Sequence, residues 1–383
     1  MADQVRILVG TKKALFVYSS DMQRKEWTVS EPMLPGWSIA NAAADTRDGK
    51  PRLYAAATHD VWGPSIAKST DGGETWDQKC EGFGFPDDMG ITIGSVWSVR
   101  PGHESQHGVV FAGTGPAGLF RSEDWGVSWS PVDSINRHEF RRLWQPIPGG
   151  ASPVHSIEID PRDANHMYIS ISGGGSYVTT DGGERWHLFS HHATAQTEEA
   201  RVFISQIAAN VPTGWDPASI SDFHRIRLDV KNPDRLWGQA HWGVFRSDDG
   251  GRAWEDVTHM NEPSGLPSFH GFPIAVTRRE PDAAYVVPLD VGGDNFRTCP
   301  GQFAVYRTRD AGATWERLTD GLPGPADYQS VYREGMDTDG LDPEGVFIGT
   351  SNGQVYASTD GGDRWQRLPG TLPPILSISC AIY

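Results

Sequence analysis

Short runs of alternating apolar and polar residues recur along the whole chain, and they predict β-strands. Residues 155–161, HSIEIDP, and residues 224–230, HRIRLDV, alternate in this way. Paired apolar runs joined by glycine-containing turns, such as residues 108–122 and 345–358, are typical of β-hairpins. The pattern therefore predicts an all-β chain built from many short strands.

A turn of the form Ser/Thr-x-Asp-x-Gly-x-x-Trp separates these strands and is repeated. The seven copies are Ser19–Trp27, Ser69–Trp76, Ser122–Trp129, Thr179–Trp186, Ser247–Trp254, Thr308–Trp315 and Ser358–Trp365, the first of them degenerate. The aspartate can accept hydrogen bonds from its own loop, glycine permits positive φ, and the tryptophan buries a large ring. We therefore interpret the seven aspartates as structural rather than catalytic.

Each copy belongs to one unit of four strands, and repetition of such a unit predicts a β-propeller. Strand A is the segment between copies, strands B and C form the hairpin, and strand D begins at the tryptophan. The chain starts without a strand A and ends with an unpaired one, residues 375–383, so this last strand should complete the N-terminal blade and close the ring. The predicted fold is all-β, a single seven-bladed propeller over residues 1–383, with blades at 375–383 plus 1–30, 37–79, 94–133, 153–190, 222–258, 270–318 and 328–368.

The repeated turns resemble Asp-box (BNR) repeats, and the chain resembles bacterial sialidase-like proteins often likened to photosystem II stability/assembly factors. The resemblance implies that the A strands line a central channel. It also implies that the B–C loops and D–A connections share one face, with the Asp-box turns on the opposite rim. Propellers host many unrelated activities, so the resemblance is informative for fold and weak for function.

Composition excludes several classes of protein. The formal net charge of -16 argues against a nucleic-acid partner. The longest apolar runs are well short of the ~18–20 residues of a membrane span. The N-terminus lacks a signal-peptide pattern, so we expect a cytoplasmic protein. Cys80, Cys299 and Cys380 are too few and too widely spread for a disulfide framework.

Irregular, chemically rich residues gather at the predicted starts of the A strands and in the B–C loops, which favours a funnel-shaped site there. The A-strand starts carry Trp37, Trp97, His155, His224 with Arg225, and His270, and the channel strand of the last blade adds Arg333 and Glu334. The B–C loops carry His59, Asp60, Trp62, His241, Trp242, Asp290 and Arg297.

These residues suggest three roles. Glu334, Asp60 and Arg333 are candidate catalytic residues. The candidate substrate-binding residues are Trp37, His59, Trp62, Trp97, Arg225, Trp242, Asp290 and Arg297. The candidate metal ligands are His155, His224, His241 and His270, which with a carboxylate would suit Zn²⁺ or Fe²⁺. The alternative is that these histidines line a polar channel and hydrogen-bond one another, with no cofactor.

The main functional hypothesis is a small-molecule hydrolase that uses a metal to activate water or substrate. One alternative is a non-catalytic binding or assembly propeller. Another is a glycosidase with paired carboxylates drawn from Asp60, Asp290, Glu139 and Glu334. True sialidase activity is disfavoured because the chain has no Arg-Ile-Pro segment. The expected ligand is a small or sugar-like molecule, with no nucleic-acid or membrane partner.

Overall fold

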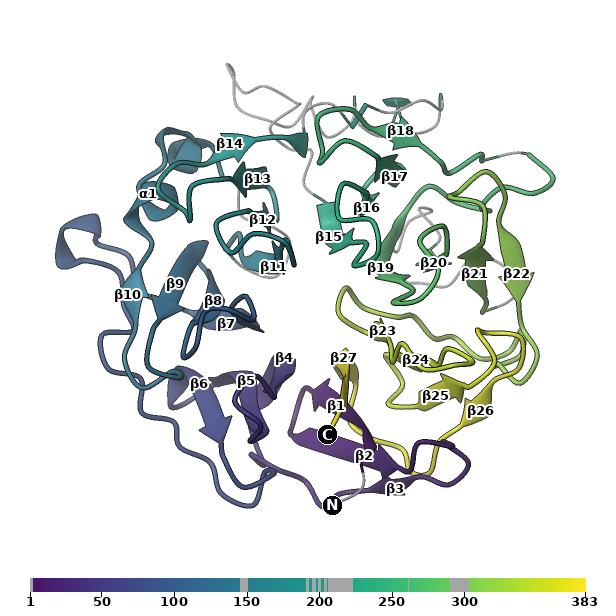
Figure 1. Ribbon diagram of the computed structural model, residues 1–383, viewed down its shortest axis with the longest axis horizontal. Helices are drawn as coiled ribbons and strands as arrows, with labels where there is room; N and C mark the ends of the chain where they lie inside the picture. The colour runs from purple at the N-terminus through teal and green to yellow at the C-terminus, as the bar shows by residue number, and fades with distance from the viewer. Residues whose placement is uncertain are drawn as a thin grey trace.

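The computed structural model places seven antiparallel sheets around a central axis, each forming one blade (Figure 1). It describes residues 3–144, 151–190, 193–194, 198, 201–202, 205, 223–260, 262–289 and 303–383. The fold is the predicted seven-bladed propeller. Within this described part of the chain, no helix is long and apolar enough to span a membrane.

The strands are given blade by blade, from the axis outward. Blade 1 has β27 (Ile375–Ile382), β1 (Val5–Thr11), β2 (Leu15–Ser20) and β3 (Thr28–Val29); blade 2 has β4 (Ser38–Asp45), β5 (Arg52–His59) and β6 (Gly63–Ser69). Blade 3 has β7 (Ser95–Pro101), β8 (Val110–Gly115), β9 (Gly118–Ser122) and β10 (Ser130–Pro131); blade 4 has β11 (Val154–Ile159), β12 (Met167–Ile171), β13 (Gly175–Thr179) and β14 (His187–Leu188). Blade 5 has β15 (Phe223–Leu228), β16 (Leu236–Ala240), β17 (Gly243–Ser247) and β18 (Glu255–Asp256). Blade 6 has β19 (Gly271–Val276), β20 (Ala284–Pro288), β21 (Val305–Thr308) and β22 (Glu316–Leu318); blade 7 has β23 (Met336–Thr338), β24 (Val346–Gly349), β25 (Val355–Ser358) and β26 (Gln366–Arg367). Helical elements with both bounds among the described residues include α1 (Asp133–Asn136) and the 3₁₀ turns η1 (Asp87–Met89) and η2 (Glu139–Leu143).

The ring closes as the sequence predicts. β27 pairs antiparallel with β1, from Val5 opposite Ile382 to Thr11 opposite Ile375. Gln4 and Tyr383 also exchange backbone hydrogen bonds of 3.0 and 3.1 Å. Both ends of the chain therefore lie in blade 1 (Figure 1).

Blade 2 departs from the expected four strands. Its outer strand is reduced to a single bridge between Lys68 and Asp77, with reciprocal backbone hydrogen bonds of 2.8 Å. The Asp77 carboxylate then accepts the Lys79 N–H at 3.0 Å, which turns the chain away from the sheet.

The repeated turns connect strands C and D, and their aspartates bind their own loops. In blade 2, Ser69 Oγ donates to Asp71 at 2.7 Å and accepts the Gly73 N–H at 2.8 Å, and the Thr75 N–H donates to Asp71 at 3.0 Å. The hydrogen bonds from Thr75 and Ser69 hold the pKa of Asp71 well below its usual range. The same hydroxyl–aspartate pair recurs at Asp124, Asp181, Asp249, Asp310 and Asp360. We call the face that carries these turns the turn face and the opposite face, which carries the B–C loops, the loop face.

The apolar core lies between neighbouring blades. One cluster joins Tyr168 of blade 4 to Phe223 and Phe245 of blade 5. Turn tryptophans pack in the same way, and Trp129 and Trp186 are 4% and 5% exposed. Each blade is therefore stabilised by the next.

Hydrogen bonds also link neighbouring inner strands around the channel. Each bond joins consecutive strands of the series β4, β7, β11, β15, β19, β23 and β27. They run from Val99 N to Asn41 Oδ1 (3.1 Å), Ser98 Oγ to Val154 O (3.1 Å), Ile226 N to Ser156 Oγ (3.4 Å), His224 Nδ1 to Gly271 O (2.6 Å), Thr338 Oγ1 to Val276 O (3.0 Å) and Cys380 N to Asp337 Oδ2 (2.8 Å). These bonds fix the relative positions of the side chains that face the axis.

A buried polar cluster ties blade 7 to the degenerate turn of blade 1. Arg24 Nη1 lies 2.8 Å from Asp339 Oδ2, and the two side chains are 4% and 0% exposed. Glu344 lies beside this pair and accepts the Arg278 N–H at 2.7 Å. Burial, reinforced by Asp339, raises the pKa of Glu344 to about 7.

Because this folded-state pKa exceeds the ordinary value of 4.5, folding stability should fall as the pH rises from about 4.5 to about 7. Glu344→Gln removes the ionisation and retains an oxygen for the Arg278 N–H. We expect it to raise the free energy of unfolding at pH 8 by about 2–3 kcal/mol and to leave it unchanged near pH 4. Chemical denaturation at both pH values measures this, with exposed Glu104→Gln as the control. Equal effects of the two substitutions would contradict the buried titration.

Candidate functional site

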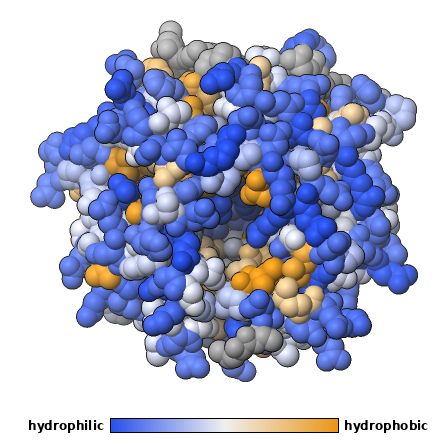
Figure 2. All heavy atoms as spheres, in the orientation of Figure 1, coloured by the Kyte–Doolittle hydropathy of each residue, from blue (hydrophilic) through white to orange (hydrophobic). Residues whose placement is uncertain are grey.

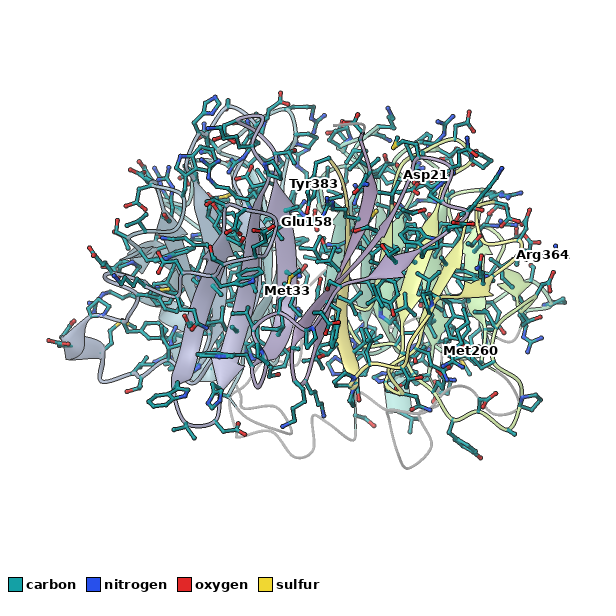
Figure 3. All side chains as sticks on the ribbon, turned by 90° about the horizontal axis from the view of Figure 1, so that it is seen from below. Asp21, Met33, Glu158, Met260, Arg364 and Tyr383 are labelled. Carbon is teal, nitrogen blue, oxygen red and sulfur yellow. The ribbon has the colours of Figure 1, made fainter. Side chains whose placement is uncertain are left out.

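The axial channel contains a cavity of about 410 Å³, lined by residues from all seven inner strands or their immediate flanks. Several lining residues lie at or just beyond the ends of these strands, among them Pro101, Val230 and Arg278. Figure 2 shows a hollow at the centre of the face seen in Figure 1. In the side view, Asp21 of a C–D turn and Glu158 of the cavity lie toward the same side, and Met260 lies toward the other (Figure 3). The cavity therefore opens to the turn face, whereas the sequence predicts a site on the loop face.

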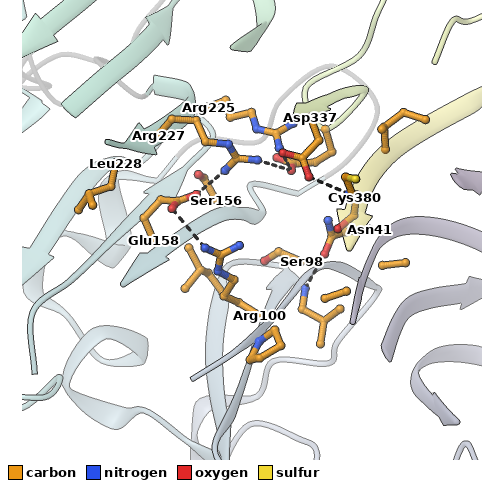
Figure 4. Close-up of a pocket in the computed structure, with 18 of the residues that line it drawn as sticks. Asn41, Ser98, Arg100, Ser156, Glu158, Arg225, Arg227, Leu228, Asp337 and Cys380 are labelled. Atoms are coloured by element: carbon orange, nitrogen blue, oxygen red, sulfur yellow. Dashed lines mark hydrogen bonds and ion pairs between the residues drawn. The ribbon is translucent and has the colours of Figure 1, made fainter. Parts of the chain in front are cut away.

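One guanidinium lies between two carboxylates in this cavity (Figure 4). Arg227 Nη1 donates to Glu158 Oε1, and Arg227 Nη2 lies 3.8 Å from Glu334 Oε2. Glu158 and Arg227 are the penultimate residues of the inner strands β11 and β15. Glu158 also lies 3.5 Å from Arg100 Nη2.

Arg225 connects blade 5 to blade 7 across the channel. Its Nη2 lies 3.1 Å from Glu334 Oε2, and its Nη1 donates to Arg333 O at 2.6 Å. Arg225 is 1% exposed, so this ion pair is shielded from water. It lies between the cavity and the loop-face end of the channel.

Burial raises the pKa of Glu334, although Arg227 and His155 oppose the rise. Glu158 and Asp337 are neighbouring negative charges that reinforce it. Asp337 pairs through both oxygens with Arg278 Nη2, at 3.1 and 3.2 Å. Among the carboxyl groups of this cavity, Glu334 is therefore the one whose environment favours the protonated form.

The structure places the predicted metal ligands in two groups. His224, His241 and His270 come together, with ring centroids 4.2 to 6.0 Å apart, while His155 lines the cavity. Gly271 O can only accept, so His224 Nδ1 carries a proton and Nε2 accepts from His241 Nε2 at 3.2 Å. Burial lowers the pKa of His270 to about 4 and that of His224 well below the ordinary range.

This arrangement does not support the metal hypothesis, which stays a prediction. Both ring nitrogens of His224 are engaged in hydrogen bonds, with Gly271 O and with His241 Nε2. Among the described residues, no group of three or more His, Cys, Asp or Glu side chains is arranged to hold a metal ion. The geometry agrees with the alternative, in which the histidines line the channel and hydrogen-bond one another.

Arg333 and Glu334 are consecutive, and they contact opposite parts of the channel. Arg333 Nη2 donates to Ser172 Oγ at 3.2 Å, and its guanidinium lies 4.9 Å from the Phe272 ring, beside the histidines. Of the predicted catalytic residues, Glu334 lines the cavity. Arg333 is not among the cavity residues, and Asp60 is exposed in a B–C loop.

The aromatic residues predicted to contact a substrate also lie in different parts of the structure. Trp37, His59 and Trp62 cluster at the loop face, with neighbouring ring centroids 5.1 and 6.4 Å apart. Trp97 is half-buried, and its indole N–H donates to Ser95 Oγ at 2.9 Å. Trp242, predicted as a substrate contact, is 3% exposed, and its indole N–H donates to Ala193 O at 3.1 Å. It therefore packs in the core and does not present a surface to a ligand.

Other candidates lie elsewhere. Glu139 is exposed in η2 and is not among the cavity residues. Asp290 and Arg297 lie outside the described residues.

Three residues of the cavity were not predicted from the sequence: Glu158, Arg227 and Asp337. The available signal was a charged side chain between two apolar residues of an inner strand, as in Ile157–Ile159 and Ile226–Leu228.

Comparison with known proteins gives distant relatives, and no family model matches the chain. An oligoxyloglucan-reducing end-specific xyloglucanase of Emericella nidulans is 28% identical over 222 residues, 54% of this chain and 26% of that protein. Xyloglucanase Xgh74A of Acetivibrio thermocellus is 24% identical over 308 residues, 74% of this chain and 32% of that protein. This chain thus spans about a quarter to a third of the length of these relatives.

Solved structures show the same fold at low identity. The GH74 enzyme of Niastella koreensis superposes with a TM-score of 0.61 at 16% identity, covering 94% of this chain and 54% of that one. YCF48 bound to D1 peptide superposes with a TM-score of 0.51 at 16% identity, covering 89% and 83%. The chain is a seven-bladed β-propeller with GH74 and YCF48 structural neighbours, and its axial cavity is lined by arginines and carboxylates.

Proposed function

We propose that this protein is a glycoside hydrolase whose two reacting carboxyl groups are Glu334 and Glu158. The observation that carries the proposal is the Arg227 guanidinium between them, in the axial cavity. Each of its two terminal nitrogens faces one carboxylate. A single guanidinium therefore separates the two carboxyl groups, and this separation is compatible with the ~5–9.5 Å between the carboxyl groups of glycosidases. The similarity to xyloglucanases supports the same class of reaction.

The environments of the two carboxyl groups assign their roles. Glu334, whose pKa burial raises, is the general acid that protonates the departing glycosidic oxygen. Glu158, paired with Arg227 and Arg100, acts as the base or nucleophile. Arg227 orients both groups and limits their repulsion.

The size of the cavity indicates which part of a glycan reacts. About 410 Å³ lies near the lower end of the ~300–1,000 Å³ of small-molecule pockets. We therefore propose that the enzyme acts at the end of an oligosaccharide and not within a polysaccharide chain.

Hydrolysis of neutral and anionic aryl glycosides and of xyloglucan oligosaccharides tests this proposal. We expect Glu334→Gln to lower kcat by about 100- to 10,000-fold, because the departing oxygen loses its proton donor. The wild-type kcat/KM should decline on the alkaline side above the ordinary glutamate range, since burial raises the pKa of Glu334.

Glu184→Gln, an exposed carboxylate in a C–D turn, is the matched control and should retain activity. Thermal unfolding of each variant separates loss of chemistry from loss of fold. If the wild type hydrolyses no member of the panel, or if Glu334→Gln hydrolyses it at the wild-type rate, the proposal is wrong.

A non-catalytic binding propeller is the second candidate, and one observation favours it. Asp337 is fully engaged, by Arg278 on both oxygens and by the Cys380 N–H at 2.8 Å, as expected of a structural carboxylate. Saturable binding of a sugar without turnover, unaffected by Glu334→Gln, would support this candidate instead.

A further inference from the structure

The cavity differs in charge from the protein around it. The chain carries a formal net charge of -16. Four guanidiniums line the cavity, those of Arg100, Arg225, Arg227 and Arg278, against three carboxylates, those of Glu158, Glu334 and Asp337. The cavity is therefore locally positive inside an acidic protein.

The four arginines differ in how far they are committed to internal pairs. The Arg225 and Arg227 side chains are 2% and 16% exposed and hold Glu334 and Glu158. The Arg100 and Arg278 side chains are 46% and 40% exposed. Arg100 contacts a carboxylate of the described residues only at 3.5 Å, and Arg278 uses Nη2 for both of its contacts with Asp337. Two guanidiniums thus present donors to solvent at the edge of the cavity.

We propose that the cavity takes an anionic sugar, one that bears a carboxylate or a sulfate ester, and that Arg100 and Arg278 bind its charged group. This inference rests on the proposed glycoside hydrolase and names the substrate class of the same site. A planar guanidinium matches a carboxylate or sulfate through paired, charge-assisted hydrogen bonds.

The catalytic roles increase the preference for an anion. In the reactive state Glu334 carries the proton that it donates, so only Glu158 and Asp337 oppose the four guanidiniums. A neutral sugar would leave this surplus positive charge uncompensated, and a cationic one would be repelled. Low-dielectric walls strengthen such a local field, whereas the acidic surface repels anions at long range. Recognition must therefore depend on contacts inside the cavity.

Ligand-induced stabilisation tests the inference without any assay of turnover. Thermal unfolding is followed with glucuronate, galacturonate, glucose 6-sulfate and glucose, each at the same concentration and ionic strength. A ligand that binds only the folded state raises Tm with concentration. We expect at least one anionic sugar to raise Tm and glucose to have no effect. The uronates and the sulfate separate the two sources of negative charge. Equal shifts with glucose and the anionic sugars, or no shift with any of them, would overturn the proposal.

Two arginine variants locate the effect. Arg100→Gln removes one guanidinium from the edge of the cavity and should weaken anionic-sugar binding by about 10- to 100-fold. Arg185→Gln makes the same change in net charge on the turn face, at a side chain that is 79% exposed and outside the cavity lining. It should leave the affinity unchanged. An equal loss in both variants would indicate a general electrostatic effect and overturn the assignment to the cavity.

Hydrolysis distinguishes this inference from the proposed function. Aryl glucuronides should be cleaved with a higher kcat/KM than the matching aryl glucosides. Cleavage of neutral glycosides in preference would overturn the inference and leave the glycosidase intact. Absence of any cleavage, together with binding of uronates, would overturn the glycosidase and leave the anion site.

Discussion

A chain that ends at Pro374 is expected to accumulate as unfolded, insoluble protein. β27 is the inner strand of blade 1, and its Ile375 and Ile378 are 0% and 1% exposed. Its removal exposes the edge of β1, opens the ring and deletes one wall of the channel. Two buried isoleucines alone contribute about 3–6 kcal/mol, which is comparable with the ~5–15 kcal/mol stability of a typical domain. Soluble yield and circular dichroism measure the outcome.

A circular permutant is the matched control, because it keeps β27 and changes only the connectivity. It begins at Thr371, joins Tyr383 to Gln4 through residues 1–3, and ends at Gly370. Tyr383 and Gln4 already exchange backbone hydrogen bonds, so the junction requires little movement. The permutant should be soluble and should unfold cooperatively. A truncated chain that unfolds near the wild-type Tm would show that closure by β27 is dispensable.

Repetition explains why the fold could be predicted so fully from sequence. Six turns with the same hydroxyl–aspartate hydrogen bond, together with the degenerate copy at Asp21, report seven blades, because each turn is determined by residues close to one another in the sequence. The closing strand followed from counting strands. The reduced outer strand of blade 2 was not predictable, because the repeated turn of this blade makes the same local hydrogen bonds as those of the four-stranded blades.

The candidate site was less predictable, since it depends on which strands face each other across the axis. Glu334 was singled out from sequence, and the structure places it in the cavity. Its partners Arg225 and Arg227 come from blade 5, about a hundred positions earlier, and no local pattern reports that pairing. The histidines did converge, but their hydrogen bonds with Gly271 O and with each other became visible only in three dimensions.

Replacement of Arg225 is expected to be the most damaging single substitution in the channel. Arg225→Met keeps the length of the side chain and removes the charge, so Glu334 loses its 3.1 Å partner and Arg333 O loses its donor. Breaking one side of a buried ion pair costs about 3–5 kcal/mol, because the remaining charge is left poorly compensated. Chemical denaturation measures the loss, and Arg364→Met serves as control. Arg364 pairs with Asp320 at 3.4 Å with both side chains exposed, so its loss should cost about 0–1 kcal/mol.

The pH dependence of the Arg225→Met penalty identifies its cause. Loss of the cation raises the folded-state pKa of Glu334 further above its unfolded value, so the penalty is present at neutral pH and shrinks as the pH falls through the raised folded-state pKa values of the variant and the wild type. Glu334→Gln removes the charge that Arg225 neutralises. The double variant Arg225→Met/Glu334→Gln should therefore be more stable at pH 7 than Arg225→Met alone. A penalty that is constant from pH 5 to pH 8 and fully additive with Glu334→Gln would arise from packing around the buried Arg225 side chain, not from its charge.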